Sequence, residues 1–187
     1  FNTIQISDEL VIPFTIMPFA EHTLASFLKD KKMSFELWLK LFNDLGQKIE
    51  LMHGLGVIHR DLKPQNLFIL NSRLLIGDCD IASFDKSKYI KLVKTKPSDR
   101  LGNYSFSAPE QADKNIDEIT PAADWYAFGQ IMYWLVHNTT VRGFQTIDLQ
   151  FKKPVYNVIV EKLLSQNPQD RFQNFKEIQV FITSEQN

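Results

Sequence analysis

The stretch "HRDLKPQN", residues 59–66, places Asp61, Lys63 and Asn66 within one short segment of chain. A carboxylate can accept the proton of an attacking hydroxyl, an ammonium can offset charge on phosphate oxygens, and an amide oxygen can coordinate Mg²⁺. Each residue alone has an ordinary structural explanation, because Asp and Lys form surface ion pairs and Asn caps turns. The three together, in a loop stiffened by Pro64, favour a phosphoryl-transfer site.

Composition narrows the class of protein. The chain has 187 residues, of which 44% are hydrophobic and 23% charged, which predicts one folded domain. A net charge of −1 favours neither a nucleic-acid partner nor an anionic membrane surface. The single cysteine, Cys79, excludes an internal disulfide and no secretory leader is evident, so we expect a cytoplasmic (intracellular) location.

The pattern of apolar residues predicts helices around one short hairpin. The opening residues 1–19 are rich in Ile, Val, Phe and Thr, which indicates two short strands. Ser34 is the expected N-cap of a long amphipathic helix that ends near Leu55. The sequence also predicts a hairpin at 67–78. A buried helix is expected to follow Thr120 as its cap, with Pro121 in its first turn. Two more helices are expected at 154–165 and 175–183. The apolar run 125–136 inside the buried helix is too short to cross a bilayer, so no membrane segment is expected.

The residues 59–66 resemble the catalytic loop of eukaryotic-type serine/threonine protein kinases. Three other segments extend the resemblance: Asp78 after the apolar "LLI" run, "APE" at 108–110, and "DWYAFG" at 124–129, which is similar to the D-x-W-x-x-G pattern of that family. The resemblance implies a mostly α fold within an α+β family. That fold is the large C-terminal lobe of a protein kinase, a helical bundle with a short catalytic β-hairpin and one or two strands left from the small lobe.

The resemblance also implies roles for individual residues. Asp61 would be the catalytic base and Lys63 would offset phosphate charge, while Asn66 and Asp78 would hold Mg²⁺ and so position ATP. The hinge-like "MPFAEHTL", from Met17 onward, would bind adenine through the Pro18 carbonyl and the Ala20 amide. Phe68 would lie beneath the adenine ring, although an ordinary core phenylalanine is an equally good reading.

Two further residues have structural roles by the same resemblance. Asp124 would support the backbone of the catalytic loop, and Arg171 would pair with Glu110. Both would hold the fold and would not touch substrate. The histidines outside the loop, including His53, show no metal-ligand spacing and are expected to be structural.

The segments before the hinge depart from the family pattern. No glycine precedes Gly46 and no lysine precedes Lys29, so the glycine-rich phosphate loop and the small-lobe lysine have no counterpart in this sequence. We therefore expect residues 1–20 to be small-lobe remnant strands and hinge. Residues 21–187 would form the C-lobe, with the catalytic loop at 59–66 and the activation segment at 78–110. As such a fragment, the chain alone is expected to be inactive or nearly so.

The expected activity of the complete protein is transfer of the ATP γ-phosphoryl group to a hydroxyl of a protein substrate. A second departure opens an alternative, because D-F-G here reads Asp78, Cys79, Asp80. A pseudokinase, acting as a scaffold or regulatory binding module without turnover, would tolerate that change. A small-molecule phosphotransferase is a third reading, disfavoured by the A-P-E element and its arginine partner.

Overall fold

The computed structural model describes residues 2–7, 10–14, 18–85, 87–88, 105–112, 119–141, 143 and 145–185, with the backbone alone for the first two ranges. Met17, at the start of the expected hinge, lies outside the described residues. Residues 89–104 of the expected activation segment also lie outside them. The described part holds five α-helices and several short strands. The prediction of a mostly helical fold is therefore confirmed.

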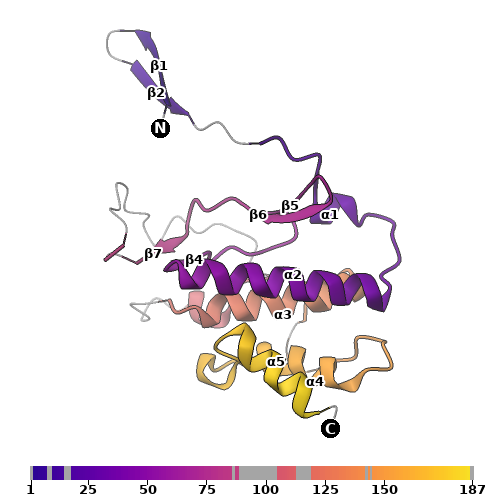
Figure 1. Cartoon of the computed structure of the whole chain (residues 1–187). Coiled ribbons are helices and arrows are strands. Elements are labelled where there is room, and N and C mark those ends of the chain that lie inside the picture. Colours follow the sequence, from indigo (N-terminus) through magenta and orange to yellow (C-terminus); the bar gives the residue numbers. More distant parts are fainter. Residues whose placement is uncertain are drawn as a thin grey trace.

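The chain opens with the two short strands that the sequence predicts, and they form a hairpin. Strands β1 (Asn2–Ser7) and β2 (Leu10–Phe14) pair antiparallel, with Ile4 opposite Ile12 and an irregularity between Gln5 and Ser7. Figure 1 shows this hairpin standing apart from the helical body.

Two small sheets frame the residues of the expected catalytic loop. Strands β3 (His22–Thr23), β5 (Leu67–Leu70) and β6 (Arg73–Ile76) form one antiparallel sheet, with β5 in the middle. Asn71 and Ser72 join β5 to β6 with φ of 49° and 61°, the left-handed geometry of a tight two-residue hairpin turn. Strands β4 (Val57–Ile58) and β7 (Ser83–Phe84) form a second pair. Residues 59–66 therefore connect one sheet to the other.

The short helix α1 (Leu24–Phe27) precedes the long helix α2 (Phe35–Gly54). Ser34 caps α2 as predicted, since its hydroxyl accepts a hydrogen bond from the Leu37 amide at 3.2 Å. The apolar face of α2 is fully buried at Trp38, Phe42 and Leu45. Burial of this face against α3 and α5 fixes the direction in which the chain enters β4 and the catalytic loop.

Helix α3 (Ala122–His137) is the buried central helix. Its predicted cap is wrong: the N-cap is Pro121 and not Thr120, and no side chain caps this end. The Thr120 and Pro121 carbonyls accept hydrogen bonds from the amides of Ala123 and Asp124 at 3.1 and 3.0 Å. Because these backbone bonds satisfy the first amides of the helix, the Thr120 hydroxyl is not needed there.

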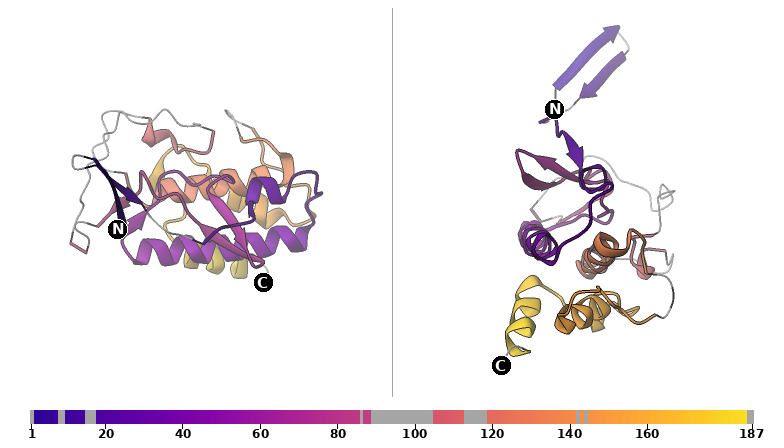
Figure 2. Two further views of the ribbon diagram at one scale, coloured as in Figure 1. Left: turned by 90° about the horizontal axis from the view of Figure 1, so that it is seen from above. Right: turned by 90° about the vertical axis from the view of Figure 1, so that its right-hand side faces the viewer.

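The last two helices form a lower layer. Helices α4 (Pro154–Leu163) and α5 (Phe175–Ser184) agree with the predicted ranges within two residues. Figure 2, in its right-hand view, shows the strands above, α2 and α3 side by side in the middle, and α4 and α5 below. Glu50 of α2 joins two of these layers, because its carboxylate accepts the Phe175 amide at the start of α5 at 2.6 Å.

Aromatic rings fill the space between the middle and lower layers. Trp38 and Phe42 of α2 stack at 5.1 Å between centroids, and the Phe42 ring also meets Phe128, Tyr156 and Phe175. The Trp38 indole N–H donates to the Met132 carbonyl of α3 at 2.9 Å. The polar atom of this large core side chain is thus hydrogen-bonded inside the core.

Gly46 lets α5 approach α2 closely. A side-chain carbon at this position would lie 2.2 Å from the Phe175 ring, so Gly46→Ala is expected to lower the free energy of unfolding by about 1–3 kcal/mol. Gly54→Ala is the matched control on the same helix, since nothing lies within 4 Å there, and it should be neutral or slightly stabilising. Urea unfolding of both variants measures the difference. Equal stability of the two would contradict this packing.

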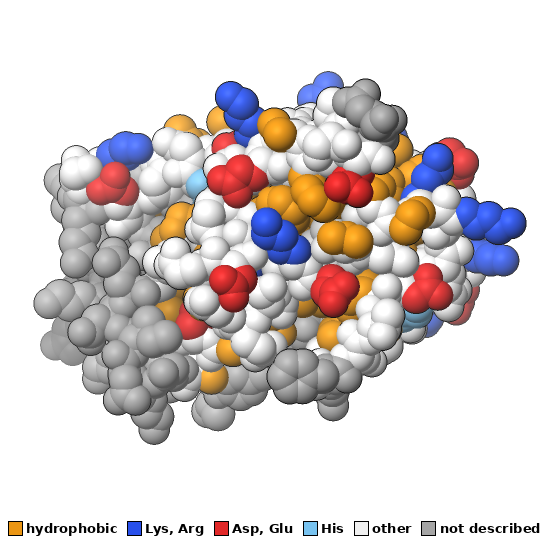
Figure 3. Space-filling view, turned by 90° about the horizontal axis from the view of Figure 1, so that it is seen from below, with side chains coloured by type: hydrophobic (Ala, Val, Ile, Leu, Met, Phe, Trp, Pro, Cys, Tyr) orange, Lys and Arg blue, Asp and Glu red, His pale blue; other side chains and the backbone are white. Residues whose placement is uncertain are grey.

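The outer face of the lower layer carries mixed chemistry. In Figure 3, hydrophobic side chains on this face are interspersed with acidic and basic ones. Val158 of α4 and Val180 of α5 are among the exposed large hydrophobic residues. In the part of the chain that the structure describes, no helix combines the length and the apolar character needed to cross a membrane.

Candidate active site

Residues 59–66, the expected catalytic loop, are hydrogen-bonded to one carboxylate of α3. Asp124 is fully buried, and its two oxygens accept the backbone amides of His59 and Arg60, each at 2.8 Å. The expected support of the loop by Asp124 is confirmed. Arg60 has φ of 71°, a left-handed conformation that is uncommon for a long side chain, and the bonds to Asp124 stabilise it.

His53 also binds Asp124, and sequence reasoning missed this contact. The His53 ring nitrogen Nε2 lies 2.9 Å from Asp124 Oδ2, and its ring meets Trp125 edge to face at 5.6 Å. His53 is at the end of α2, 71 residues before Asp124. Only the packing of α2 on α3 brings the two together, so no local spacing could have indicated the pair.

The structure brings Asp61, Lys63 and Asn66 into direct contact. Asp61 Oδ2 accepts hydrogen bonds from Lys63 Nζ at 2.6 Å and from Asn66 Nδ2 at 2.9 Å, and Nδ2 also donates to the Asp61 carbonyl at 2.8 Å. Both donors use the same carboxylate oxygen. Among the described residues, no hydrogen bond occupies Asp61 Oδ1, so that oxygen is available to an incoming hydroxyl.

The orientation of Asn66 suits a cation. The side chain is 4% exposed, and both hydrogens of its amide nitrogen are directed at Asp61. The amide oxygen therefore points away from Asp61, and no described residue donates to it. An oxygen held in this way is a suitable ligand for Mg²⁺, which takes oxygen ligands from one or two side chains and completes its shell with phosphate and water.

Backbone contacts bring the segment before Asp78 to the same loop. The Gly77 amide donates to the Asn66 carbonyl at 3.0 Å, and the His59 ring Nε2 lies 2.9 Å from the Gly77 carbonyl. Asp78 itself is exposed and has φ of 63°. The two expected magnesium ligands thus lie on chain segments that are hydrogen-bonded to each other. Within the described residues no group of three or more His, Cys, Asp or Glu could hold a metal ion.

Of the expected adenine-binding residues, Pro18 and Ala20 precede strand β3, and Phe68 belongs to strand β5 of the same sheet. Pro18 is exposed and Ala20 half-buried, directly before β3, where Thr23 pairs with Phe68 of β5. The half-buried Phe68 ring packs on Gly77, where a side-chain carbon would approach it to 2.8 Å. Phe68 therefore contacts the segment that precedes Asp78, and its side chain keeps part of its surface exposed.

Cys79 and Asp80 replace the last two residues of D-F-G, and both are exposed. Although the residue is exposed to solvent, partial desolvation of its sulfur raises the pKa of the Cys79 thiol above its usual range, and the carboxylates of Asp78, Asp80 and Asp124 raise it further. The thiol is therefore expected to stay neutral near pH 7.

The reactivity of Cys79 tests this electrostatic environment. Alkylation by iodoacetamide at pH 8 should be slower in the folded chain than in the chain unfolded by urea, because less thiolate is present. Asp80→Asn removes one of the charges that raise the pKa and should speed the folded-state reaction. Faster alkylation of the folded wild type than of the unfolded chain would contradict the expected shift.

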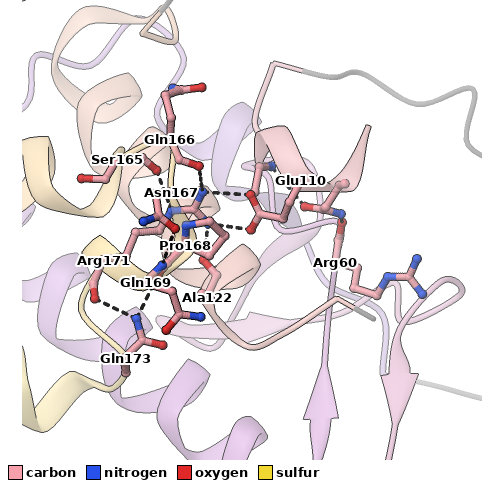
Figure 4. Close-up of polar contacts among 12 residues, drawn as sticks. Arg60, Glu110, Ala122, Ser165, Gln166, Asn167, Pro168, Gln169, Arg171 and Gln173 are labelled. Carbon is pink, nitrogen blue, oxygen red and sulfur yellow. Dashed lines mark hydrogen bonds and ion pairs between the residues drawn. The ribbon is translucent and has the colours of Figure 1, made fainter. Parts of the chain in front are cut away.

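A buried ion pair lies at the end of the expected activation segment. The two terminal nitrogens of the Arg171 guanidinium, Nη1 and Nη2, donate to the Glu110 carboxylate at 2.6 and 2.8 Å, as expected from the resemblance (Figure 4). The remaining guanidinium hydrogens go to the backbone carbonyls of Ser165, Ala122 and Gln166. Arg171 and Glu110 are 2% and 7% exposed, so this pair is enclosed by protein.

Gln111 connects that ion pair to the catalytic loop. Its side-chain Nε2 donates to the Arg60 carbonyl at 2.8 Å, and its Oε1 accepts the Ala108 amide at 3.1 Å. The "APE" segment and the residue before Asp61 are therefore one hydrogen-bonded unit. Sequence reasoning missed Gln111, because its partner is 51 residues away and glutamine in a turn carries no distinctive pattern.

Comparison with known proteins agrees with these features. Residues 1–183 match the protein kinase domain, so the chain belongs to the protein kinase family. Similar proteins include the serine/threonine-protein kinase ppk21 of Schizosaccharomyces pombe, at 29% identity over 73% of this chain and 25% of that kinase. A probable serine/threonine-protein kinase of Clostridium perfringens, CPE1738, is 23% identical over 95% of this chain and 28% of its own length.

A third similar protein is the interferon-induced, double-stranded RNA-activated protein kinase of Mus musculus, 27% identical over 80% of this chain and 30% of that kinase. The chain thus spans between a quarter and a third of the length of these three relatives.

Proposed function

We propose that this chain supplies the catalytic loop of a serine/threonine protein kinase, which transfers the γ-phosphoryl group of ATP to a hydroxyl of a protein substrate. The proposal depends on how the two carboxylate oxygens of Asp61 are hydrogen-bonded. One carboxylate oxygen is held by Lys63 and Asn66, and the other has no partner among the described residues. A base fixed in this way meets a substrate hydroxyl without first having to reorient.

The neighbouring residues fit the remaining requirements. The ammonium of Lys63 carries three donors, so it can stay bound to Asp61 and still donate to a phosphate oxygen. Asn66 and Asp78 would coordinate Mg²⁺, which supplies charge neutralisation for the phosphates when bound. Pro18 and Ala20 would present a backbone carbonyl and amide to adenine, above Phe68.

The division of the chain follows from these roles. We propose that residues 1–20 are remnant small-lobe strands with the hinge, and that residues 21–187 are the C-lobe. The activation segment would run from 78 to 110, and Glu110 with Arg171 would anchor its end. The single cysteine is compatible with an intracellular protein.

An alternative is a pseudokinase that binds a partner without turnover. One observation favours it: Cys79 is exposed and Asp80 replaces glycine, so the triplet lacks the packed aromatic residue of D-F-G. An additional carboxylate beside Asp78 would also repel the phosphates of ATP unless Mg²⁺ shields it.

Phosphotransfer by the full-length protein separates the two functions. The full-length protein is incubated with Mg²⁺ and ATP labelled at the γ-phosphate, with dephosphorylated casein as acceptor. The expected result is label on serine or threonine, together with a higher melting temperature in Mg²⁺-ATP that Asp78→Ala abolishes. Asp170→Ala, at an exposed surface acid, is the matched control and should keep both signals. If the wild type shows no label transfer and no stabilisation by Mg²⁺-ATP, the kinase function is overturned in favour of the scaffold.

A further inference from the structure

A groove of about 800 Å³ lies beside α1 and the start of α2. In Figure 1 these two elements lie at the end of the helical body opposite β4 and β7. The groove is bounded by α1, by the segment 28–35 that leads into α2, by the end of α3, and by residues 149–151 before α4. None of the expected site residues lines it. Its volume falls in the range of sites that hold small ligands or short peptide segments.

The floor of the groove is apolar. Leu28, Leu135 and Leu149 are buried beneath it, and Trp134 and Phe151 are half-buried in its walls. Half-buried aromatic side chains of this kind still have apolar surface to cover, and tryptophan is frequent among the residues that dominate peptide-binding energy.

The rim of the groove is basic. Lys29, Lys31 and Lys32 are exposed along it, and Asp30 is the one acidic residue among the described residues of the lining. Lys31 lies over the Phe27 ring at 3.6 Å, and none of the three lysines forms a salt bridge with a described carboxylate. Three lysines on one short segment attract a ligand with several negative charges.

Polar groups and fixed backbone geometry complete the site. The exposed side chains of Asn138 and Gln150 face the same groove and can pair with peptide amides. Asp30, Asn138 and Gln150 all have left-handed φ, at 62°, 54° and 60°. The three turns that contain these residues are thus held in restricted backbone conformations, which favours a preformed site.

We propose that this groove binds an acidic peptide segment, with an aromatic or aliphatic anchor over Trp134 and Phe151 and carboxylates at Lys29, Lys31 and Lys32. The mixture of polar and apolar lining residues favours a peptide over a fatty acid, whose chain needs an apolar tunnel. The groove would recruit a protein through a segment separate from the hydroxyl that is phosphorylated. Binding at this site does not depend on phosphotransfer, so it can be tested even in a protein without turnover.

Fluorescence anisotropy with three labelled octapeptides tests the proposal on the full chain. The first has glutamate and aspartate around a central Phe-Leu pair, the second has lysine in place of every acid, and the third has Ser-Ser in place of Phe-Leu. We expect the first to bind, the second not to bind, and the third to bind about tenfold more weakly. Binding of the first should also weaken as salt is raised.

Charge reversal identifies the site. The triple variant Lys29→Glu, Lys31→Glu, Lys32→Glu should bind the first peptide at least about tenfold more weakly. The matched triple variant Lys40→Glu, Lys88→Glu, Lys176→Glu reverses three exposed lysines outside the groove and should bind like wild type. Circular dichroism checks that both variants fold. Equal weakening by both triple variants, no binding of any acidic peptide, or binding of dansyl-undecanoate in place of the peptide would overturn the proposal.

Discussion

Replacing Arg171 with alanine is expected to lower the free energy of unfolding by about 3–5 kcal/mol, because the Glu110 carboxylate is then left buried without its partner. The same change also strips donors from the carbonyls of Ala122, Ser165 and Gln166. Urea unfolding, followed by tryptophan fluorescence, measures the loss. Few other single changes in the chain should cost as much.

Two further variants distinguish the stability lost with the ion pair from the stability lost by removing any arginine. Arg73→Ala removes an exposed arginine of β6 and should change stability by less than about 0.5 kcal/mol. The double variant Arg171→Met, Glu110→Leu removes both charges together and should be more stable than Arg171→Ala. If Arg171→Ala and Arg73→Ala cost the same, the buried pair does not stabilise the fold as described.

Asp61→Asn should lower phosphotransfer by the full-length protein about 10²–10⁴-fold, if the proposed function holds. The asparagine retains the shape of the side chain and one oxygen to accept from Lys63, but it cannot take a proton from the substrate hydroxyl. Mg²⁺-dependent binding of ATP should persist, because Asn66 and Asp78 are unchanged. The rate of label transfer to casein and the ATP-dependent shift in melting temperature measure the two effects separately.

Asp44→Asn is the matched control for Asp61→Asn. Asp44 is paired with Lys48 on α2 as Asp61 is paired with Lys63, but it lies outside the loop. Its replacement should leave the transfer rate unchanged. Equal rates of label transfer for the wild type and Asp61→Asn would show that Asp61 is not the catalytic base.

Local patterns were sufficient to predict most of the helices. The apolar spacing and the Ser34 cap identify α2 because both signals lie within the helix itself. The start of α3 was misassigned because Thr120 next to Pro121 has the pattern of a side-chain cap, and only the observed backbone bonds show that none is required. Strand residues 67–70 and 73–76 were identifiable from two apolar runs and the turn between them.

The candidate site was predictable where its contacts are local or match a known pattern. Asp61, Lys63 and Asn66 belong to one short loop, and their mutual contacts follow from that loop. The resemblance to kinases also indicated the distant pair of Arg171 and Glu110. The contacts of His53 and Gln111 were not predictable, because each depends on how helices and turns far apart in sequence come to lie beside each other.

The hold of Asp124 on the catalytic loop has a consequence for how the loop moves. The two oxygens of Asp124 accept hydrogen bonds from the backbone amides of the consecutive residues His59 and Arg60. This carboxylate is buried in the interior of the protein. Loosening the loop would leave two backbone amides without their acceptor and the buried Asp124 carboxylate with only His53 as a partner among the described residues, so local fluctuation there is strongly disfavoured. These two amide hydrogens should therefore exchange with solvent deuterium only when the α2–α3 interior opens as a whole.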